Sequence, residues 1–190
     1  MPAAVAAYVA VEPAQAVEAP AGWIEVLEFF SYGCSHCYRL NAPAKAWATA
    51  QPADVVFRRV PVTFDRPQLA PLAKLFYALE ATGQMTALDH AVFVAIHEQN
   101  QTLATDEAVL NWVAGRGVDL PAFKAAYESP EVQAKVTRAA ELTRAYKVTG
   151  TPSLYVAGRY GVNNAAATSY DNLMELTGRL VDKLRRGEKP

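Results

Sequence analysis

The two cysteines of this 190-residue chain, Cys34 and Cys37, enclose Ser35 and His36. They follow an apolar segment, Trp23–Phe30, that is expected to form a strand, and they begin a segment expected to be helical. Cysteines three residues apart at a helix start lie on one face of the first turn, so their sulfurs can join in a disulfide or separate without backbone rearrangement. A disulfide stabilises mainly by restricting long loops of the unfolded chain. The spacing therefore predicts thiol redox chemistry rather than a structural crosslink.

Cys34 is the better candidate for the attacking sulfur. In the first turn of a helix several backbone N–H groups have no partner within the helix, and the dipole favours negative charge there. His36 can add a hydrogen-bond donor or a positive charge, which would lower the pKa of the thiol below its ordinary value of about 8.5. Cys37 lies one turn deeper, where burial disfavours the ionised form, and this suits a resolving thiol. A passive crosslink is the alternative, and it does not account for the position at a helix start.

Metal and haem binding are two further uses of a cysteine pair. A zinc site would require His90 or His97 to reach the cysteines, and neither histidine lies in a second ligand pair of familiar spacing. Haem attachment would require a histidine where Tyr38 stands. We therefore expect no metal and no cofactor. His90 and His97 lie seven residues apart on one predicted helix and are expected to be surface or packing residues.

Glu28 interrupts the apolar strand six residues before Cys34. A carboxylate is costly to bury unless it pairs with a cation or stays protonated. We therefore consider Glu28 a candidate proton relay to Cys37. Arg58 or Arg59 on the neighbouring predicted strand is a candidate partner, although side-chain alternation lets only one of them face inward. A position at a solvated strand end is the alternative for Glu28.

The composition argues against nucleic acid as a partner. The chain has 18 basic and 19 acidic residues, a net charge of -1 and no basic run, so it offers no electrostatic footprint for a phosphate backbone. No segment reaches the roughly 20 uninterrupted apolar residues that span a bilayer. The first basic residue is Arg39, so the charged start of an export signal is missing. We expect that the chain begins near a mature N-terminus from which a signal peptide has been removed.

The hydrophobic pattern predicts strands on either side of a helical block. Helical signals fill the chain from Phe64 to about Tyr146, and the leucines of the last helix, between Leu173 and Leu184, are expected to be core packing. The predicted strands are 8–11, 23–30, 55–62 and 153–157 with a hairpin partner after Gly158, and the predicted helices are 34–50, 67–82, 85–99 and four that begin after Thr105, Asp119, Ser129 and Ser169.

This order of elements, with three motifs, resembles the DsbA family. The motifs are residues 27–32 (Leu-Glu-Phe-Phe-Ser-Tyr), residues 34–38 (Cys-Ser-His-Cys-Tyr) and residues 148–153 (Val-Thr-Gly-Thr-Pro-Ser). A lone Cys-x-x-Cys is a weak signal, whereas this one follows the expected strand and is joined by a Thr-Pro pair ahead of a hairpin. Ser35 stands where the best-known members have proline, and Asn41 stands where an acidic residue is often found.

The resemblance implies an α/β fold, namely a thioredoxin-like fold with an all-helical domain inserted after the second core strand. Residues 1–22 then form a lead-in with an edge strand. Residues 23–63 and 147–190 form the thioredoxin-like domain, and residues 64–146 form the inserted helical domain with its connecting helix.

The resemblance also implies an activity and a set of site residues. A protein of this family passes the Cys34–Cys37 disulfide to reduced exported proteins through a mixed disulfide at Cys34, in the periplasm, and a DsbB-like, quinone-linked membrane protein reoxidises it. Pro152 would be a cis-proline whose loop faces the cysteines, and Thr151 would offer its backbone to an extended substrate segment. The surface around Tyr32, His36 and Pro152 would receive substrate and partner.

Two other functions stay open at this point. A reductase or isomerase would share the fold, but isomerases of this kind usually carry an additional dimerisation domain, and only about 20 residues precede the core here, which argues against this alternative. We expect the protein to be a monomer. A non-catalytic peptide-binding or chaperone module with a vestigial cysteine pair is the second alternative. Loss of activity on Cys34→Ala would reject it.

Overall fold

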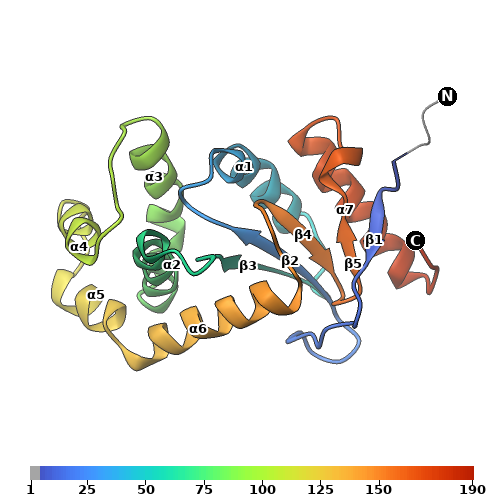
Figure 1. The fold of residues 1–190 in the computed structure, drawn as a ribbon, viewed down its shortest axis with the longest axis horizontal. Coiled ribbons are helices and arrows are strands. Elements are labelled where there is room, and N and C mark those ends of the chain that lie inside the picture. Colours follow the sequence, from blue (N-terminus) through green and yellow to red (C-terminus); the bar gives the residue numbers. More distant parts are fainter. Residues whose placement is uncertain (1–4) are drawn as a thin grey trace. The chain divides into compact units, whose positions relative to one another are not determined.

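The computed structural model describes residues 5–190; residues 1–4 of the predicted lead-in lie outside the described residues. The chain forms two compact units. The first contains the chain up to Phe29 with residues 39–60 and 148–190, and the second contains residues 30–38 and 61–147. The predicted thioredoxin-like domain also contains residues 30–38, 61–63 and 147, which belong to the second unit here. We retain the predicted boundaries as a proposal. Figure 1 labels the elements of both units.

The first unit is built on a five-stranded sheet in the order β1-β5-β4-β2-β3. β4 pairs antiparallel with β2 and with β5, and β1 pairs antiparallel with β5 at one edge, as the edge-strand prediction required. In Figure 1 the arrows of β2 and β3 point the same way. The strands are β1 (Tyr8–Ala10), β2 (Ile24–Phe30), β3 (Val55–Pro61), β4 (Ser153–Val156) and β5 (Tyr160–Val162).

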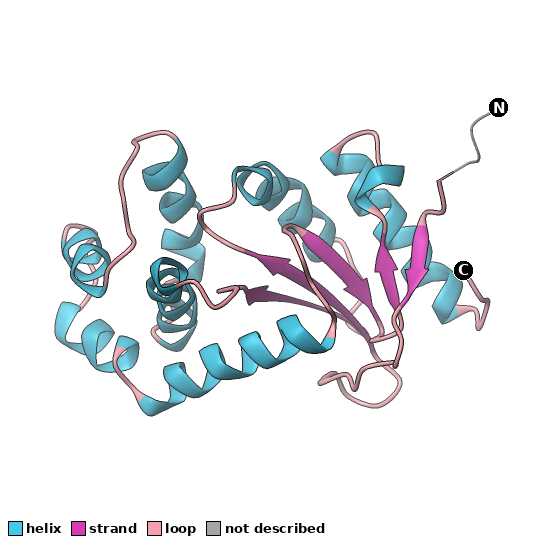
Figure 2. Cartoon of the chain, viewed as in Figure 1, coloured by secondary structure: helices cyan, strands magenta, loops and turns pink. Residues whose placement is uncertain are grey.

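Two helices share an apolar core with this sheet: α1 (Ser35–Thr49), which begins in the second unit, and α7 (Tyr170–Arg185). Figure 2 draws the helices in cyan and the strands in magenta. Val26 and Leu154 of the central strands pack with Leu40 of α1 and with Leu173 and Leu180 of α7. These side chains are at most 3% exposed. A strand that is apolar along nearly its whole length, such as β2, needs helices packed over the sheet to keep it from water. The leucine stripe of α7 is therefore core packing, as its spacing predicts.

The predicted hairpin joins β4 to β5 through a tight turn. Ala157 and Gly158 both have positive φ, at 53° and 67°, and the N–H of Arg159 donates to the carbonyl of Val156 at 3.1 Å. Such a turn matches the right-handed twist of paired strands. A Cβ atom at Gly158 would lie 2.1 Å from the carbonyl oxygen of Gln15, so glycine is required there. The turn thus anchors the N-terminal segment.

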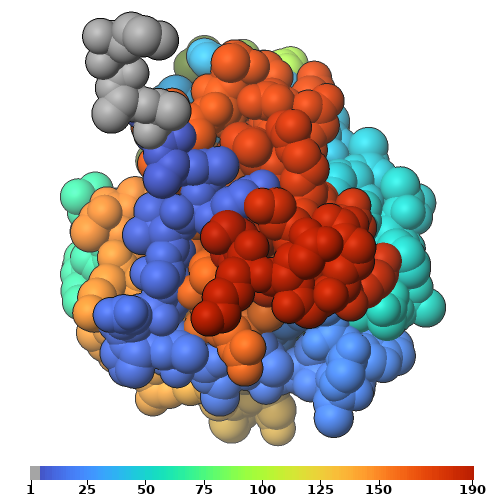
Figure 3. Space-filling view, turned by 90° about the vertical axis from the view of Figure 1, so that its right-hand side faces the viewer, coloured from blue at the N-terminus to red at the C-terminus, as the bar shows by residue number. Residues whose placement is uncertain are grey.

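Strand β1 and helix α7, from opposite ends of the described chain, lie side by side within the first unit. The hydroxyl of Tyr8 in β1 donates to the carbonyl of Leu176 in α7 at 3.1 Å. Figure 3 shows the N-terminal segment in blue beside the C-terminal helix in red. This contact ties the edge strand to the last helix.

Apart from Phe30 of β2 and Pro61 of β3, the regular elements of the second unit are helices. Helix α2 contacts each of α3, α4, α5 and α6, and its apolar residues form a core with Phe30, Tyr32 and Cys37. The helices are α2 (Ala70–Ala81), α3 (Met85–His97), α4 (Asp106–Ala114), α5 (Leu120–Tyr127) and α6 (Pro130–Ala145), with 3-10 turns at Pro67–Leu69 here and at Asn164–Ala166 in the first unit.

The helix starts confirm the predicted capping residues. The side chains of Thr105, Asp119 and Ser129 accept N–H groups at the starts of α4, α5 and α6, and Ser169 does the same for α7. The predicted helix 67–82 is divided into a 3-10 turn and α2, where Pro71 occupies the first turn without an N–H to lose. Within residues 5–190 no helix is both long and apolar enough to cross a membrane.

Candidate active site

The Cys-x-x-Cys motif lies at the start of α1, as the sequence predicts. Both cysteines are free thiols; Cys34 is half-buried and Cys37 is fully buried. The sulfur of Cys34 accepts a hydrogen bond from the N–H of Cys37 at 3.3 Å. A helix-start N–H on the sulfur favours the thiolate over the thiol. The more accessible sulfur is therefore also the one placed to carry negative charge.

A tight turn leads into the motif. The N–H of Gly33 donates to the Oγ of Ser31 at 3.2 Å, and the N–H of Cys34 donates to the carbonyl of Ser31 at 3.0 Å. The two peptide groups that precede Cys34 are thereby fixed. Ser35 and His36, between the cysteines, are both exposed.

Tyr32 does not lie on the surface. Its side chain is 1% exposed, and its hydroxyl donates to the carboxylate of the buried Asp89 at 2.7 Å. The expectation that the Tyr32 side chain forms part of an exposed docking surface is therefore wrong. The ring packs against Phe30, Phe76 and Phe93, and this aromatic cluster draws it into the core of the second unit.

Thr151 and Pro152 lie in the first unit, directly before β4. The peptide bond between them is cis, as the family resemblance implies and against the general frequency of such bonds. The carbonyl of Pro152 accepts from the Nδ2 of Asn164 at 2.7 Å, and the Oγ of Ser153 donates to the carbonyl of Gly150 at 2.8 Å. Thr151 is half-buried, and Pro152 is buried. These bonds hold the loop in one conformation.

Glu28 is buried in β2 and pairs with Arg59 of β3. Its Oε2 lies 3.4 Å from the Nε of Arg59, and the two side chains are 1% and 9% exposed. A position at a solvated strand end is therefore excluded. The choice between Arg58 and Arg59 is also settled, because adjacent strand residues point to opposite faces.

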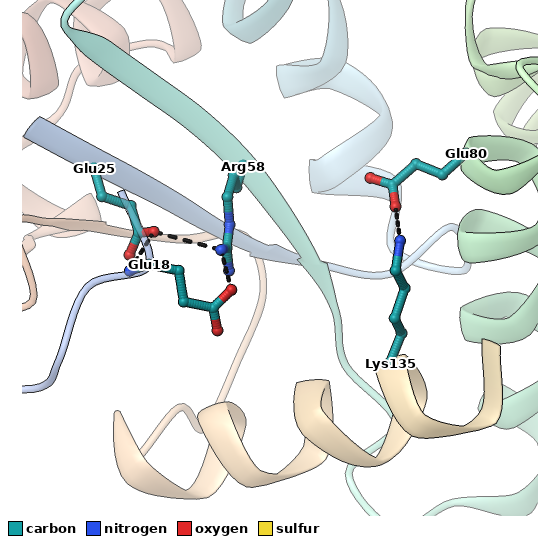
Figure 4. Close-up of polar contacts among 5 residues, drawn as sticks. All are labelled: Glu18, Glu25, Arg58, Glu80 and Lys135. Carbon is teal, nitrogen blue, oxygen red and sulfur yellow. Dashed lines mark hydrogen bonds and ion pairs between the residues drawn. The ribbon is translucent and has the colours of Figure 1, made fainter. Parts of the chain in front are cut away.

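Arg58 belongs to a second ionic group that sequence reasoning missed (Figure 4). It pairs with Glu18 and lies 3.5 Å from Glu25 of β2, whose carboxylate also accepts the N–H of Glu18 at 3.1 Å. Burial raises the pKa of Glu25, and the Arg58 guanidinium opposes that shift. Figure 4 also shows the exposed pair of Glu80 and Lys135, 3.0 Å apart, between α2 and α6.

His97 makes a contact with the motif region that its spacing did not predict. Its Nε2 lies 2.7 Å from the carbonyl oxygen of Tyr32, and its ring stacks on that of Tyr38 at 5.4 Å. The earlier interpretation as a packing residue is thus incomplete. Among the described residues no group of three or more His, Cys, Asp or Glu side chains is placed to hold a metal ion.

Comparisons with known proteins agree with this geometry. The family described as DSBA-like thioredoxin domain matches residues 25–176. A thiol:disulfide interchange protein DsbA from Burkholderia cepacia is 41% identical over 90% of this chain and 78% of its own length. The one from Azotobacter vinelandii is 36% identical over 93% of this chain and 82% of its own.

Solved structures give the same result. Pseudomonas aeruginosa DsbA has a TM-score of 0.89 at 34% identity, covering 95% of this chain and 93% of that one. The oxidoreductase NmDsbA1 from Neisseria meningitidis has a TM-score of 0.85 at 29% identity, covering 95% and 92%. Fold and motif define a thiol-disulfide oxidoreductase with a thioredoxin-like fold and a helical insertion. The chain belongs to the DsbA family, and its activity is that of a thiol-disulfide oxidase.

Proposed function

We propose that Cys34 and Cys37 are the redox pair and that their disulfide is donated to reduced exported proteins. A substrate thiolate attacks the sulfur of Cys34, which forms a mixed disulfide and releases Cys37 with the bonding electron pair. A second substrate thiolate then attacks the substrate sulfur of the mixed disulfide. The substrate gains its disulfide, and the protein leaves with two reduced cysteines.

The observation that carries this proposal is the contrast between the two cysteines. The half-buried sulfur of Cys34 accepts the N–H of Cys37 at 3.3 Å, whereas Cys37 itself is fully buried. A stabilised thiolate is a good leaving group, so the mixed disulfide at Cys34 is resolved readily by a substrate thiol. The same stabilisation favours the reduced protein, and this makes the disulfide form an oxidant.

The other site residues have supporting roles in this proposal. His36 and Ser35 are exposed between the cysteines, and His36 adds a donor near the Cys34 sulfur. The loop of Thr151 and Pro152 offers backbone groups to an extended substrate segment. Glu28 relays a proton to Cys37, and its pairing with Arg59 is what makes a buried carboxylate tolerable there.

Partners and location follow from family membership as part of the proposal. The protein acts as a monomer in the bacterial periplasm on proteins that have just been exported. A DsbB-like membrane protein that is linked to quinone takes up the electrons. No nucleic acid takes part, in keeping with a net charge of -1.

Equilibration with glutathione tests the proposal. The protein disulfide and two glutathione thiols exchange with the protein dithiol and glutathione disulfide, and we expect the reduced protein to dominate even in a strongly oxidising mixture. Cys34→Ala should abolish oxidation of a reduced, unfolded test protein, and Cys37→Ala should trap a mixed disulfide. An equilibrium near that of glutathione itself would favour the isomerase alternative. If Cys34→Ala assists refolding of the test protein as well as the wild type does, the chaperone alternative is supported and the proposal is overturned.

A further inference from the structure

Helix α3 contacts the chain on both sides of the Cys-x-x-Cys motif, and these contacts lie within the second unit. Tyr32 stands two residues before Cys34, and Tyr38 stands directly after Cys37. Two side chains of α3 form hydrogen bonds with Tyr32. Tyr38 stacks on a ring of α3 and forms a hydrogen bond with the C-cap residue of that helix. The motif is thus held at both ends by one helix.

Tyr32 is held at two atoms. Its hydroxyl donates to Asp89 at 2.7 Å, and its carbonyl oxygen lies 2.7 Å from the Nε2 of His97. Both Tyr32 and Asp89 are almost fully buried, so their bond is shielded from water. A carbonyl can only accept, and therefore the Nε2 of His97 carries the hydrogen.

With the hydrogen bond from His97, both polar groups of the peptide that links Tyr32 to Gly33 have partners. The carbonyl of this group accepts from His97 at 2.7 Å, and its N–H donates to the Oγ of Ser31 at 3.2 Å. The orientation of this peptide dipole, one residue before Cys34, is thereby set. The same turn is closed by the N–H of Cys34, which donates to the carbonyl of Ser31 at 3.0 Å, and the Cys34 sulfur in turn accepts the N–H of Cys37 at 3.3 Å. The turn therefore sets where the sulfur meets the helix start, and a donor that is already in place stabilises the thiolate without having to reorient.

His97 also contacts the other end of the motif. Its ring lies nearly parallel to that of Tyr38, at an angle of 5° and a centroid distance of 5.4 Å. The hydroxyl of Tyr38 donates to the carboxylate of Glu98, the residue after His97. His90, one heptad earlier on α3, has its ring 5.9 Å from the same tyrosine ring. His97 therefore contacts both flanks of the motif, whereas the ring contact of His90 is on one flank.

We propose that His97 is a positioning residue for the redox reaction, acting through the carbonyl of Tyr32 on the turn that places the Cys34 sulfur against the N–H of Cys37. The inference rests on the proposed role of Cys34 as the reacting sulfur. The contacts of His97 are with Tyr32 and Tyr38, so its effect on the sulfur is exerted through the turn. Its hydrogen bond holds the turn in the geometry that favours negative charge at Cys34.

The test compares three variants. His97→Phe keeps a ring for the stack on Tyr38 but removes the N–H, His97→Gln restores a donor, and His90→Phe changes the matched histidine on the same tyrosine. A net hydrogen bond contributes about 0.5–1.5 kcal/mol, and loss of this free energy from the reduced form should lower the equilibrium constant for reduction by glutathione more than twofold and up to about twelvefold in His97→Phe. The ultraviolet absorbance of the Cys34 thiolate should then appear at higher pH. His97→Gln should recover most of both values, and His90→Phe should leave them at the wild-type level.

Each result has a defined meaning. If His97→Phe lowers the melting temperature but leaves the equilibrium constant within twofold of wild type, His97 is only structural and the inference is overturned. Failure of His97→Gln to recover, or an equal effect of His90→Phe, also overturns it. If wild-type Cys34 ionises like free cysteine, the proposed function itself fails. The ¹⁵N shifts of the wild-type His97 ring provide a measurement that no folding defect can affect, and a hydrogen on Nδ1 alone would overturn the inference.

Discussion

Raising the pH from about 4.5 to about 8 should widen the difference in stability between the reduced and oxidised forms. In the reduced form the sulfur of Cys34 accepts the N–H of Cys37 at 3.3 Å at the start of α1. The oxidised form has no thiolate to accept this bond. The entropy lost by the unfolded chain when the disulfide closes its short loop is the same at either pH. The pH-dependent part of the difference therefore measures the thiolate.

The size of the effect follows from these contacts. A hydrogen bond to a charged acceptor contributes about 1.5–3 kcal/mol. The helix start adds about 0.3–1 kcal/mol at a partly exposed sulfur. In the proposed mechanism these contacts lower the pKa of the Cys34 thiol in the folded protein, so the contribution is complete above the unfolded pKa of about 8.5 and is lost as the pH falls through the folded value. At about pH 8, half a unit below the unfolded pKa, roughly 0.7 kcal/mol of the thiolate's contribution has not yet developed. The stability difference between the reduced and oxidised forms should therefore increase by about 1–3 kcal/mol.

Urea unfolding of both redox forms at the two pH values measures this difference, provided that the slope with urea stays the same. Cys34→Ala is the control, because it keeps every other titrating group and removes the thiolate. The reasoning is refuted if the difference between the reduced and oxidised forms changes by less than about 0.5 kcal/mol between the two pH values. The sulfur would then ionise as it does in water.

Two further predictions concern ionic groups outside the motif. Arg59→Met should lower the free energy of unfolding by about 3–5 kcal/mol, because it removes the guanidinium 3.4 Å from the buried Glu28 carboxylate. Adding Glu28→Leu should restore most of the loss, and equal urea midpoints for the single and double variants would contradict the pairing. Tyr127→Phe should cost about 1 kcal/mol at neutral pH, because Asp106 loses a hydrogen bond of 2.7 Å. Although burial raises the pKa of Asp106, hydrogen bonds from Lys74 and Tyr127 hold it below its ordinary value, so this cost should shrink as the pH falls through that low pKa; a cost that stays constant in acid would argue against the bond.

The sequence alone predicted most helices and strands to within a few residues. The reason is visible at the starts of α4 and α6, where the side chains of Thr105 and Ser129 accept the N–H of a residue three positions later. The β4–β5 turn likewise depends on consecutive residues, Ala157 and Gly158. Capping and turns are interactions between near neighbours in the chain, and so they can be recognised without a fold.

The candidate site was predicted in part. The cysteine motif and the cis bond before Pro152 were identified from the residues and the family resemblance. The buried position of Tyr32 was not, because an aromatic residue beside a motif has the same local pattern whether it faces solvent or a core. The contact of His97 with that residue joins positions 65 apart, and no local signal marks it.

Residue types and short spacings by themselves determined the chemistry of this protein, the starts of its helices and its redox motif. The tertiary structure decided which side chains meet across the chain. Glu28 pairs with Arg59 while Arg58 turns to Glu25, since pairing of β2 with β3 gives each neighbouring arginine a different face. Such choices depend on packing between distant segments, whose free energy no local pattern contains.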